Sequence, residues 1–347
     1  MGKDVIIVTG SCGRIGTAIV KRLGETYSIV GFELLKAIYA SSNEELVPVD
    51  LSSDESVHQA FMHIKHFYGN RIAAVIHLAA YYSFAEKNSV KYNEITVKGT
   101  ERLLKQLENF EVEQFIFTST MLIHKPTEVG KPINEDSPIE GTWGYPQSKI
   151  DTEKLIHEKR GKMPAVFLRI AGVYDDDCHS IPISHQIQRI YEKQMNAHLF
   201  SGNIHHGAAF VHMNDVVDAI AMCVEKRKEL PEETPLIIGE SKTLSYDQMQ
   251  REISKLLFNK EITTIRVPKW FAKFGAWVLC LISFRHKPFI RPWMISIADD
   301  HYELDTKRAE KLLGWKTKYT VEKTLPVMIE KLKQDPQKWY KMNQLGK

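Results

Sequence analysis

The chain has 347 residues and a formal net charge of +3, and it is long enough to bury a large core as one large domain or two smaller ones. It has no lysine- or arginine-rich run, so we do not expect it to bind nucleic acid. Four scattered cysteines without metal-ligand spacing favour free thiols, and an N-terminus without the blocks of a signal peptide favours a cytoplasmic protein.

The first predicted element is a strand that runs into a glycine-rich turn. Residues 4–9 are mostly β-branched, and apolar residues at helical spacing follow the turn. The spacing is Gly-x-x-Gly-x-x-Gly, one residue longer than the common dinucleotide-binding pattern, and each glycine suits a tight turn or a close approach of backbone to a pyrophosphate. We therefore predict cofactor contacts from Gly10, Cys12, Gly13, Arg14, Ile15 and Gly16.

Short apolar strands and helices then alternate through residue 118. The predicted strands are residues 28–32, 47–49, 73–77 and 115–118, and the predicted helices are residues 54–67 and 89–108. This alternation predicts an α/β fold with a doubly wound parallel sheet, the Rossmann arrangement. Ligands of such sheets bind at the carboxyl ends of the strands, so we expect the chemistry there.

Acidic residues end two of these strands. Glu33 lies where a carboxylate can bind a ribose 2′-hydroxyl and repel a 2′-phosphate, which favours NAD over NADP. Arg14 and Lys36 lie close by in sequence and could instead attract that phosphate. Asp50 could accept a hydrogen bond from the adenine amino group, and His77 is expected to be a packed strand residue. Residues suited to a close cofactor follow at Leu78, Ala79 and Ala80.

The predicted catalytic pair is Tyr145 and Lys149 at the start of a helix. Residues four apart lie on one helical face, so the ammonium can lie near the phenol and lower its pKa. Such a tyrosine can exchange a proton with an alcohol or carbonyl while a nicotinamide exchanges hydride with the carbon. Tyr319 and Lys323 share the spacing, but no strand end or phosphate-binding turn lies beside them in sequence, and we interpret them as coincidental. The strand before the pair ends in three hydroxyl residues, Thr118, Ser119 and Thr120.

In these features the chain resembles the extended short-chain dehydrogenase/reductases, the NAD-dependent epimerase/dehydratase group. The resemblance extends from the N-terminus to about Trp315. Further residues that match family motifs are Asp50-Leu51, Leu168-Arg169-Ile170-Ala171-Gly172-Val173-Tyr174, Phe210-Val211-His212-Met213-Asn214-Asp215-Val216 and Asp305-Thr306-Lys307-Arg308-Ala309.

The resemblance implies roles for the matching residues. Tyr145 is similar to the family's acid/base, Lys149 to the residue that tunes it and binds the nicotinamide ribose, and Thr120 or its neighbour Ser119 to the Ser/Thr that binds the reacting oxygen. The cofactor residues that it implies are the turn residues, Glu33, Asp50, Leu51, residues 78–80, Thr118, Tyr145 and Lys149.

Two departures from the family pattern narrow the reaction. Met121-Leu122 replaces the Asp-Glu of the sugar 4,6-dehydratases, which argues against that dehydration. Thr96 stands where many members have an asparagine, so the role of that position in a proton path or in sheet structure stays open.

The resemblance also implies a smaller, interleaved substrate-binding part. We expect residues 1–174 to form the NAD-binding domain, with later strands near 208–226 and 235–240 returning to it. Residues 175–207 and 241–347 would then form the substrate-binding part.

Several features of this second part leave alternatives open. The acidic and histidine residues of 175–206 lack metal-ligand spacing, so we predict solvated loops and no metal site. Arg189 and Arg291 could bind a substrate phosphate, although surface arginines are the simpler interpretation. The apolar segment 270–284 is too short to span a bilayer; it is a buried helix, an apolar wall for a lipid-like substrate, a weak membrane-surface contact or a homodimer contact. Residues 321–328 are predicted as a last helix, and the end after Lys331 as solvated.

The sequence therefore predicts an NAD-dependent oxidoreductase that acts on a small molecule. Hydride would pass between nicotinamide and a secondary alcohol or ketone, with Tyr145 as acid/base. The alternatives are a nucleotide-sugar epimerase with tightly bound NAD and, from another class, a cofactor-binding regulator without turnover. A hydroxy or keto compound and a nucleotide sugar both remain candidate substrates.

Overall fold

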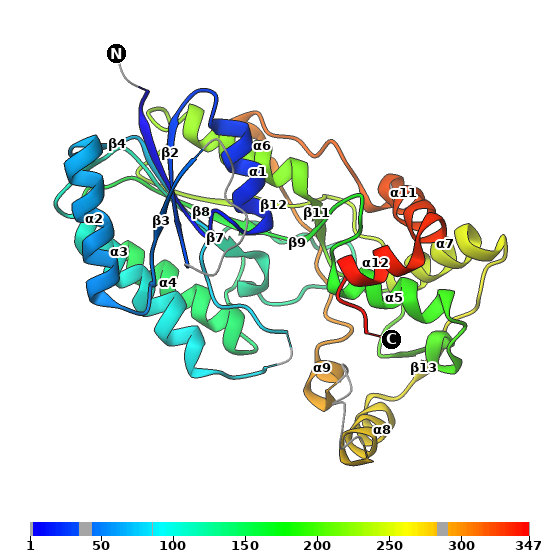
Figure 1. Cartoon of the computed structure of the whole chain (residues 1–347). Coiled ribbons are helices and arrows are strands. Elements are labelled where there is room, and N and C mark those ends of the chain that lie inside the picture. Colours follow the sequence, from blue (N-terminus) through cyan, green and yellow to red (C-terminus); the bar gives the residue numbers. More distant parts are fainter. Residues whose placement is uncertain (1–2, 35–43, 85, 283–290, 347) are drawn as a thin grey trace.

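A seven-stranded parallel sheet is the centre of the computed structural model, which describes residues 3–34, 44–84, 86–282 and 291–346 (Figure 1). From edge to edge, the strands are β12 (Glu233–Ile238), β8 (Ala165–Ile170), β7 (Phe115–Thr120), β5 (Ala74–His77), β1 (Val5–Thr9), β2 (Ser28–Glu33) and β3 (Glu44–Pro48). The strand order reverses between β1 and β5, and ligands of doubly wound sheets bind in the crevice at such a reversal. The predicted α/β class and doubly wound sheet are confirmed.

Alternation along the strands explains why helices cover both faces of the sheet. Ile6 and Val8 of β1 lie in one buried cluster, whereas Val5 and Ile7 lie in another, because successive strand residues point to opposite faces. The first cluster includes residues of α1 (Arg14–Leu23), α6 (Met213–Glu225) and α10 (Lys307–Leu313). The second includes residues of α2 (Asp54–Tyr68), α3 (Lys98–Leu107) and α4 (Gly144–Lys159).

A third buried cluster lies among helices of the second half of the chain. It draws on α5 (Ile181–Tyr191), α7 (Tyr246–Phe258), α11 (Val321–Gln334) and α12 (Pro336–Met342). The helices α8 (Lys269–Ile282) and α9 (Pro292–Ser296) project away from the sheet at the bottom of Figure 1. None of the described helices is long and apolar enough to cross a lipid bilayer.

Short elements complete the chain. Three two-stranded parallel sheets pair β4 (Arg71–Ile72) with β6 (Glu111–Val112), β9 (Gly172–Tyr174) with β11 (Phe210–His212), and β10 (Leu199–Ser201) with β13 (Ile265–Val267). A π-helical turn, η1 (Tyr92–Val97), precedes α3, and the 3₁₀ turns are η2 (Met121–Ile123) and η3 (Met195–His198).

Four details differ from the sequence-based expectations. The third strand lies at 44–48 rather than 47–49, and the helix expected at 89–108 divides into η1 and α3. Of the two late segments expected at the main sheet, β12 pairs with β8, but β11 pairs with β9 outside that sheet. The end after Lys331 is only partly solvated: α12 buries Trp339 and Tyr340 in the third cluster, while polar residues such as Lys333 and Lys338 are exposed.

Candidate active site

The glycine turn after β1 has the geometry of an anion-binding turn. Gly10 has a φ of +72°, a left-handed conformation that favours glycine, and its carbonyl oxygen accepts a hydrogen bond from the Gly13 amide. A Cβ on Gly16 would lie 2.2 Å from that carbonyl oxygen, so a side chain there would push the helix off the turn. Helix α1 begins directly after Gly13, and the first amides of a helix have no partner within it. These residues therefore fit a diphosphate.

Glu33, at the end of β2, lies beside the same turn. Its carboxylate accepts hydrogen bonds from the Cys12 amide at 3.3 Å and from the Leu34 amide at 2.9 Å. Arg14 is directed elsewhere: it donates to the His179 carbonyl oxygen at 3.4 Å and interacts with the charge of Asp175. A carboxylate therefore lies beside the glycine turn, where it would repel the 2′-phosphate of NADP, and this supports NAD. Lys36 lies outside the described residues.

The end of β5 is organised by a buried, neutral histidine. Burial lowers the pKa of His77 to about 3, and the nearby Lys149 charge contributes. Its two ring nitrogens lie 2.7 Å from the Thr9 hydroxyl and 2.9 Å from the Thr100 hydroxyl. Thr9 also accepts a hydrogen bond from the Ala79 amide, so the segment 78–80 is held beside the glycine turn. His77 is therefore the packed strand residue that the sequence predicted.

The other predicted cofactor residues are placed at the same edge of the sheet. Asp50 is exposed, and its Oδ1 accepts hydrogen bonds from the Ser52 amide and hydroxyl, which lower the Asp50 pKa. Leu51 is buried and would contact a Cβ built on Gly99. Thr96, at the position of the family's asparagine, is buried in η1 and accepts a hydrogen bond from the Tyr81 amide. Thr96 thus holds the segment that follows residues 78–80.

Tyr145, Lys149 and Thr120 converge at the carboxyl end of β7. Helix α4 begins at Gly144, so Tyr145 and Lys149 lie one turn apart on the same face. Lys149 is 2% exposed, and its ammonium donates to the Thr118 carbonyl oxygen at 2.6 Å and lies 5.8 Å from the centre of the Tyr145 ring. The Tyr145 hydroxyl is hydrogen-bonded to the Thr120 side chain. The structure therefore brings Thr120, Tyr145 and Lys149 together, as a proton transfer through Tyr145 requires.

Burial sets the protonation of this pair. It raises the pKa of Tyr145 well above its ordinary value, against a smaller lowering by the Thr120 hydrogen bond. It lowers the pKa of Lys149 to about 7. The Tyr145 pKa is therefore raised, opposite to the lowering that the sequence predicted, because burial disfavours the charged phenolate.

The three hydroxyls at the end of β7 have different environments. The Thr118 hydroxyl donates to the His77 carbonyl oxygen at 2.9 Å, and the Thr120 hydroxyl also accepts from the Leu122 amide at 3.3 Å. The Ser119 hydroxyl is buried and has no hydrogen-bond partner among the residues that the structure describes. Of the two candidates for the residue that binds the reacting oxygen, Thr120 is the one beside Tyr145.

Aromatic side chains that the sequence analysis did not single out surround Tyr145. The Tyr82 ring centre lies 4.8 Å from that of Tyr145, and the Trp143 ring centre lies 5.6 Å from it. Trp293 of α9 lies 5.5 Å from Trp143, and Phe84 lies 5.9 Å from Trp143. We call these four residues the aromatic wall. The local signals were the aromatic run after Ala80 and the tryptophan just before the catalytic helix; nothing in the sequence joins them to Trp293.

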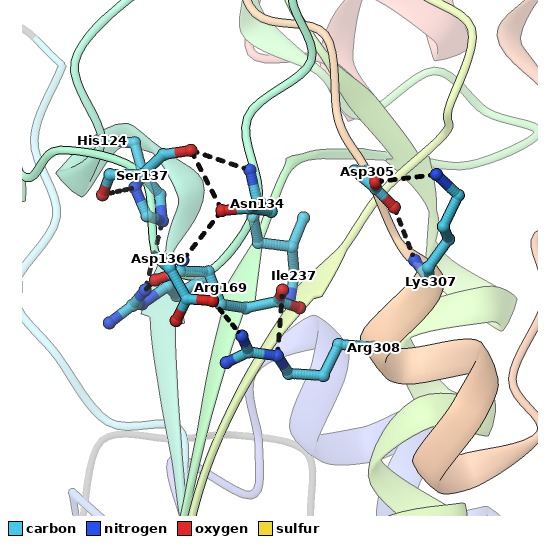
Figure 2. Close-up of polar contacts among 10 residues, drawn as sticks. His124, Asn134, Asp136, Ser137, Arg169, Ile237, Asp305, Lys307 and Arg308 are labelled. Atoms are coloured by element: carbon cyan, nitrogen blue, oxygen red, sulfur yellow. Dashed lines mark hydrogen bonds and ion pairs between the residues drawn. The ribbon is translucent and has the colours of Figure 1, made fainter.

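A nearly buried ionic network is centred on Arg169, and Figure 2 shows the part of it that includes His124 and Arg308. Glu153 follows Lys149 by one more turn and pairs with Arg169 of β8 at 2.8 Å, with both side chains nearly buried. Arg169 also donates to the Glu135 carbonyl oxygen and lies 3.2 Å from a ring nitrogen of His124. The Glu135 carboxylate accepts from the Ile237 amide of β12. The network ties α4 to the loop that follows η2.

The cluster after β9 is more buried than expected. Asp175, Asp177 and His179 are partly buried and offer ligand atoms within 4.8 Å of one another, so the structure brings together residues whose spacing in sequence did not indicate a site. The His179 ring lies 2.6 Å from the Asp175 carboxylate, and the turn lies beside Arg14. Asp177 pairs with Lys331 at 2.9 Å. Arg189, in α5, donates to the Tyr246 hydroxyl.

The comparisons with known proteins agree with this geometry. The family model described as NAD dependent epimerase/dehydratase family matches residues 6–239. The chain belongs to this family. Its members depend on NAD, which fits the acid at Glu33 and the glycine turn, and the chain is an NAD-dependent oxidoreductase or epimerase.

Relatives of two activities match this family member over most of its length. The mouse 3 beta-hydroxysteroid dehydrogenase type 7 is 25% identical over 357 residues, covering 92% of the chain and 93% of the relative. The UDP-glucose 4-epimerase of Vibrio cholerae is 22% identical, covering 91% and 92%. A solved UDP-glucose 4-epimerase from Thermotoga maritima, with UDP-glucose, has a TM-score of 0.71 at 19% identity over 95% of this chain and 99% of its own, a likeness in fold.

Proposed function

We propose that the protein is an NAD-dependent dehydrogenase that interconverts a secondary alcohol and a ketone on an apolar ring system. The observation that carries the proposal is the aromatic wall: Tyr82 and Trp143 pack against the Tyr145 ring, and Trp293 and Phe84 extend this surface. Aromatic side chains recognise flat apolar rings through burial and ring contacts. The near full-length match to a hydroxysteroid dehydrogenase supports a fused-ring substrate.

The chain's own residues have defined tasks in this reaction. The hydroxyls of Tyr145 and Thr120 hold the reacting oxygen. Because burial keeps Tyr145 protonated, its phenol donates a proton to the oxygen when the ketone is reduced, and in the reverse direction the resulting phenolate takes that proton back from the alcohol. Lys149 is fixed by the Thr118 carbonyl oxygen, and its other N–H groups are available to the nicotinamide ribose. The glycine turn and Glu33 hold the diphosphate and the adenosine ribose. Bound NAD supplies the hydride acceptor.

Sugar dehydration does not fit this site. The residues after Thr120 are Met121 and Leu122, which form η2 and have no acidic or basic group. Elimination of water needs an acid and a base there in the sugar 4,6-dehydratases. We also propose that residues 175–207 and 241–347 bind the substrate, because Trp293 joins the aromatic wall from that part.

Nucleotide-sugar epimerisation is the second candidate. The Vibrio cholerae epimerase matches across 91% of the chain, and an epimerase would use the same tyrosine, lysine and threonine. The two reactions differ in the fate of the hydride. A dehydrogenase releases reduced cofactor in step with product, whereas an epimerase returns the hydride to the sugar and shows no net reduction.

The test uses the purified full chain with NAD and two substrates, a 3-hydroxysteroid and UDP-glucose. We expect NADH to accumulate with the steroid and no interconversion of the sugar. Trp293→Ala should raise the steroid KM about tenfold, because it removes one face of the wall. Phe67→Ala, an exposed aromatic on α2, is the matched control and should leave KM unchanged.

Two outcomes would contradict the proposal. Conversion of UDP-glucose without NADH accumulation would assign the epimerase instead. NADH formation from small polar alcohols, together with an unchanged KM in Trp293→Ala, would show that the aromatic wall does not bind the substrate.

A further inference from the structure

Helix α8 presents an apolar face to solvent. Trp270, Phe271, Phe274 and Trp277 are 72%, 56%, 59% and 53% exposed, whereas Ala276 on the opposite side is buried. At 100° per residue the four aromatics fall within about one third of the helix circumference. The interpretation of this segment as a buried helix is therefore wrong for the described part of α8. A contiguous exposed aromatic patch of this kind marks an interaction surface.

In sequence, α8 lies in a stretch whose charged residues are all basic. Residues 262–298 contain no aspartate or glutamate, and Lys273 lies exposed on the α8 turn between Trp270 and Trp277. Lys269, at the start of α8, pairs with Asp299. The basic residues of this stretch are Arg266, Lys269, Lys273, Arg285, Lys287 and Arg291.

The same helix pair reaches the candidate active site. Helix α9 follows α8 in the projecting unit of Figure 1, and its Trp293 belongs to the aromatic wall beside Trp143 and Tyr145. The exposed aromatics and the wall are thus carried by neighbouring short helices. Whatever covers α8 lies next to one side of the substrate site.

We propose that α8 docks on the surface of a lipid bilayer that contains anionic lipids. The aromatic face would enter the headgroup region, where tryptophan is favoured, and Lys273 would face the anionic headgroups. A second copy of the chain fits less well, because a two-fold contact through this face would bring like charges together. The proposal rests on the proposed function, since an apolar substrate dissolved in lipid would then reach the aromatic wall through α9.

The test measures binding of the full chain to vesicles, without substrate or NAD. We expect the protein to float in a density gradient with phosphatidylcholine vesicles that contain phosphatidylserine, and much less with phosphatidylcholine alone. Brominated acyl chains should quench its tryptophan fluorescence. The combined variant Trp270→Ser, Phe274→Ser, Trp277→Ser should lower the vesicle-bound to free ratio at least about tenfold. Lys273→Glu should lower it roughly tenfold on anionic vesicles only.

Matched controls separate docking from general effects of substitution. Phe67→Ser and Lys65→Glu change exposed residues of α2 and should bind vesicles like the wild type. The α8 variants alter exposed side chains, so their thermal unfolding should match that of the wild type.

Two results would overturn the proposal. The first is no binding to either vesicle. The second is a concentration-dependent dimer in lipid-free solution that the combined variant abolishes, because it would assign the face to self-association. Since the binding assay contains no substrate or cofactor, its failure is distinct from failure of the proposed dehydrogenase reaction.

Discussion

The chain contains the tyrosine–lysine spacing twice, and the two copies have different surroundings. Tyr145 and Lys149 both lie inside α4, with the ammonium buried against β7. Tyr319 precedes the N-cap residue Thr320 of α11, so Lys323 lies in the helix while Tyr319 lies outside it. The Tyr319 ring stacks on His212 at 4.2 Å and is 37% exposed. In Figure 1, α4 and α11 lie in different parts of the molecule.

The difference shows that the four-residue spacing brings a tyrosine and a lysine together only when both residues lie within one helix. A shared helical face requires both residues within one helix, and the cap at Thr320 separates the second pair. The carboxyl end of β7 supplies the other contacts of the pair. The Thr118 carbonyl oxygen accepts a hydrogen bond from Lys149, and the Thr120 side chain is hydrogen-bonded to Tyr145. The second copy lacks both contacts. Substitutions made in parallel at the two copies can therefore test this explanation.

The largest difference is expected between Tyr145→Phe and Tyr319→Phe. Removal of the Tyr145 hydroxyl should lower kcat by about two to four orders of magnitude, because the proton loses its acceptor. Tyr319→Phe should change kcat less than about twofold, since its backbone amide, not its hydroxyl, bonds Asp215. Steady-state rates with NAD and the ring alcohol give the comparison.

Cofactor binding supplies the control for the first pair. Tyr145→Phe should bind NAD nearly as tightly as the wild type, measured by calorimetry. Equal turnover in both variants would remove the Tyr145 hydroxyl from the reaction, whereas NAD binding without turnover even in the wild type would favour a regulator over either enzyme.

The first copy could be identified from the sequence because each group of residues around it lies at the end of a predicted strand. Glu33 and Thr118–Thr120 end strands, the glycine turn and residues 78–80 follow strands, and the parallel sheet brings those strand ends together. The aromatic wall could not be assembled in this way, since Trp143 and Trp293 meet only through long-range packing. The raised tyrosine pKa also escaped prediction, because spacing gives the position of a charge and not the depth of burial.

A second comparison concerns the residue one turn beyond each lysine. Glu153 forms a nearly buried ion pair with Arg169, whereas Val327 at the matching position of α11 is 39% exposed. Glu153→Gln should lower the free energy of unfolding by about 3 kcal/mol, because it leaves a buried guanidinium without its carboxylate. Val327→Gln should change it by less than about 0.5 kcal/mol. Urea unfolding at neutral pH measures both, and equal losses would show that the Arg169 network contributes little to stability.

The smallest expected difference lies in how stability depends on pH. Burial lowers the pKa of Lys149 from 10.5 to about 7, so between those values the unfolded chain binds more protons than the folded one. The free energy of unfolding should therefore rise with pH by roughly 2 kcal/mol between about pH 7 and pH 9 through this residue, measured without NAD. Lys149→Met should lose that rise, whereas Lys323→Met, at an exposed position, should keep the wild-type slope. Identical slopes for wild type and Lys149→Met would mean that the folded protein holds a fully charged ammonium through this range, and the environment of the first copy would then be less apolar than its burial implies.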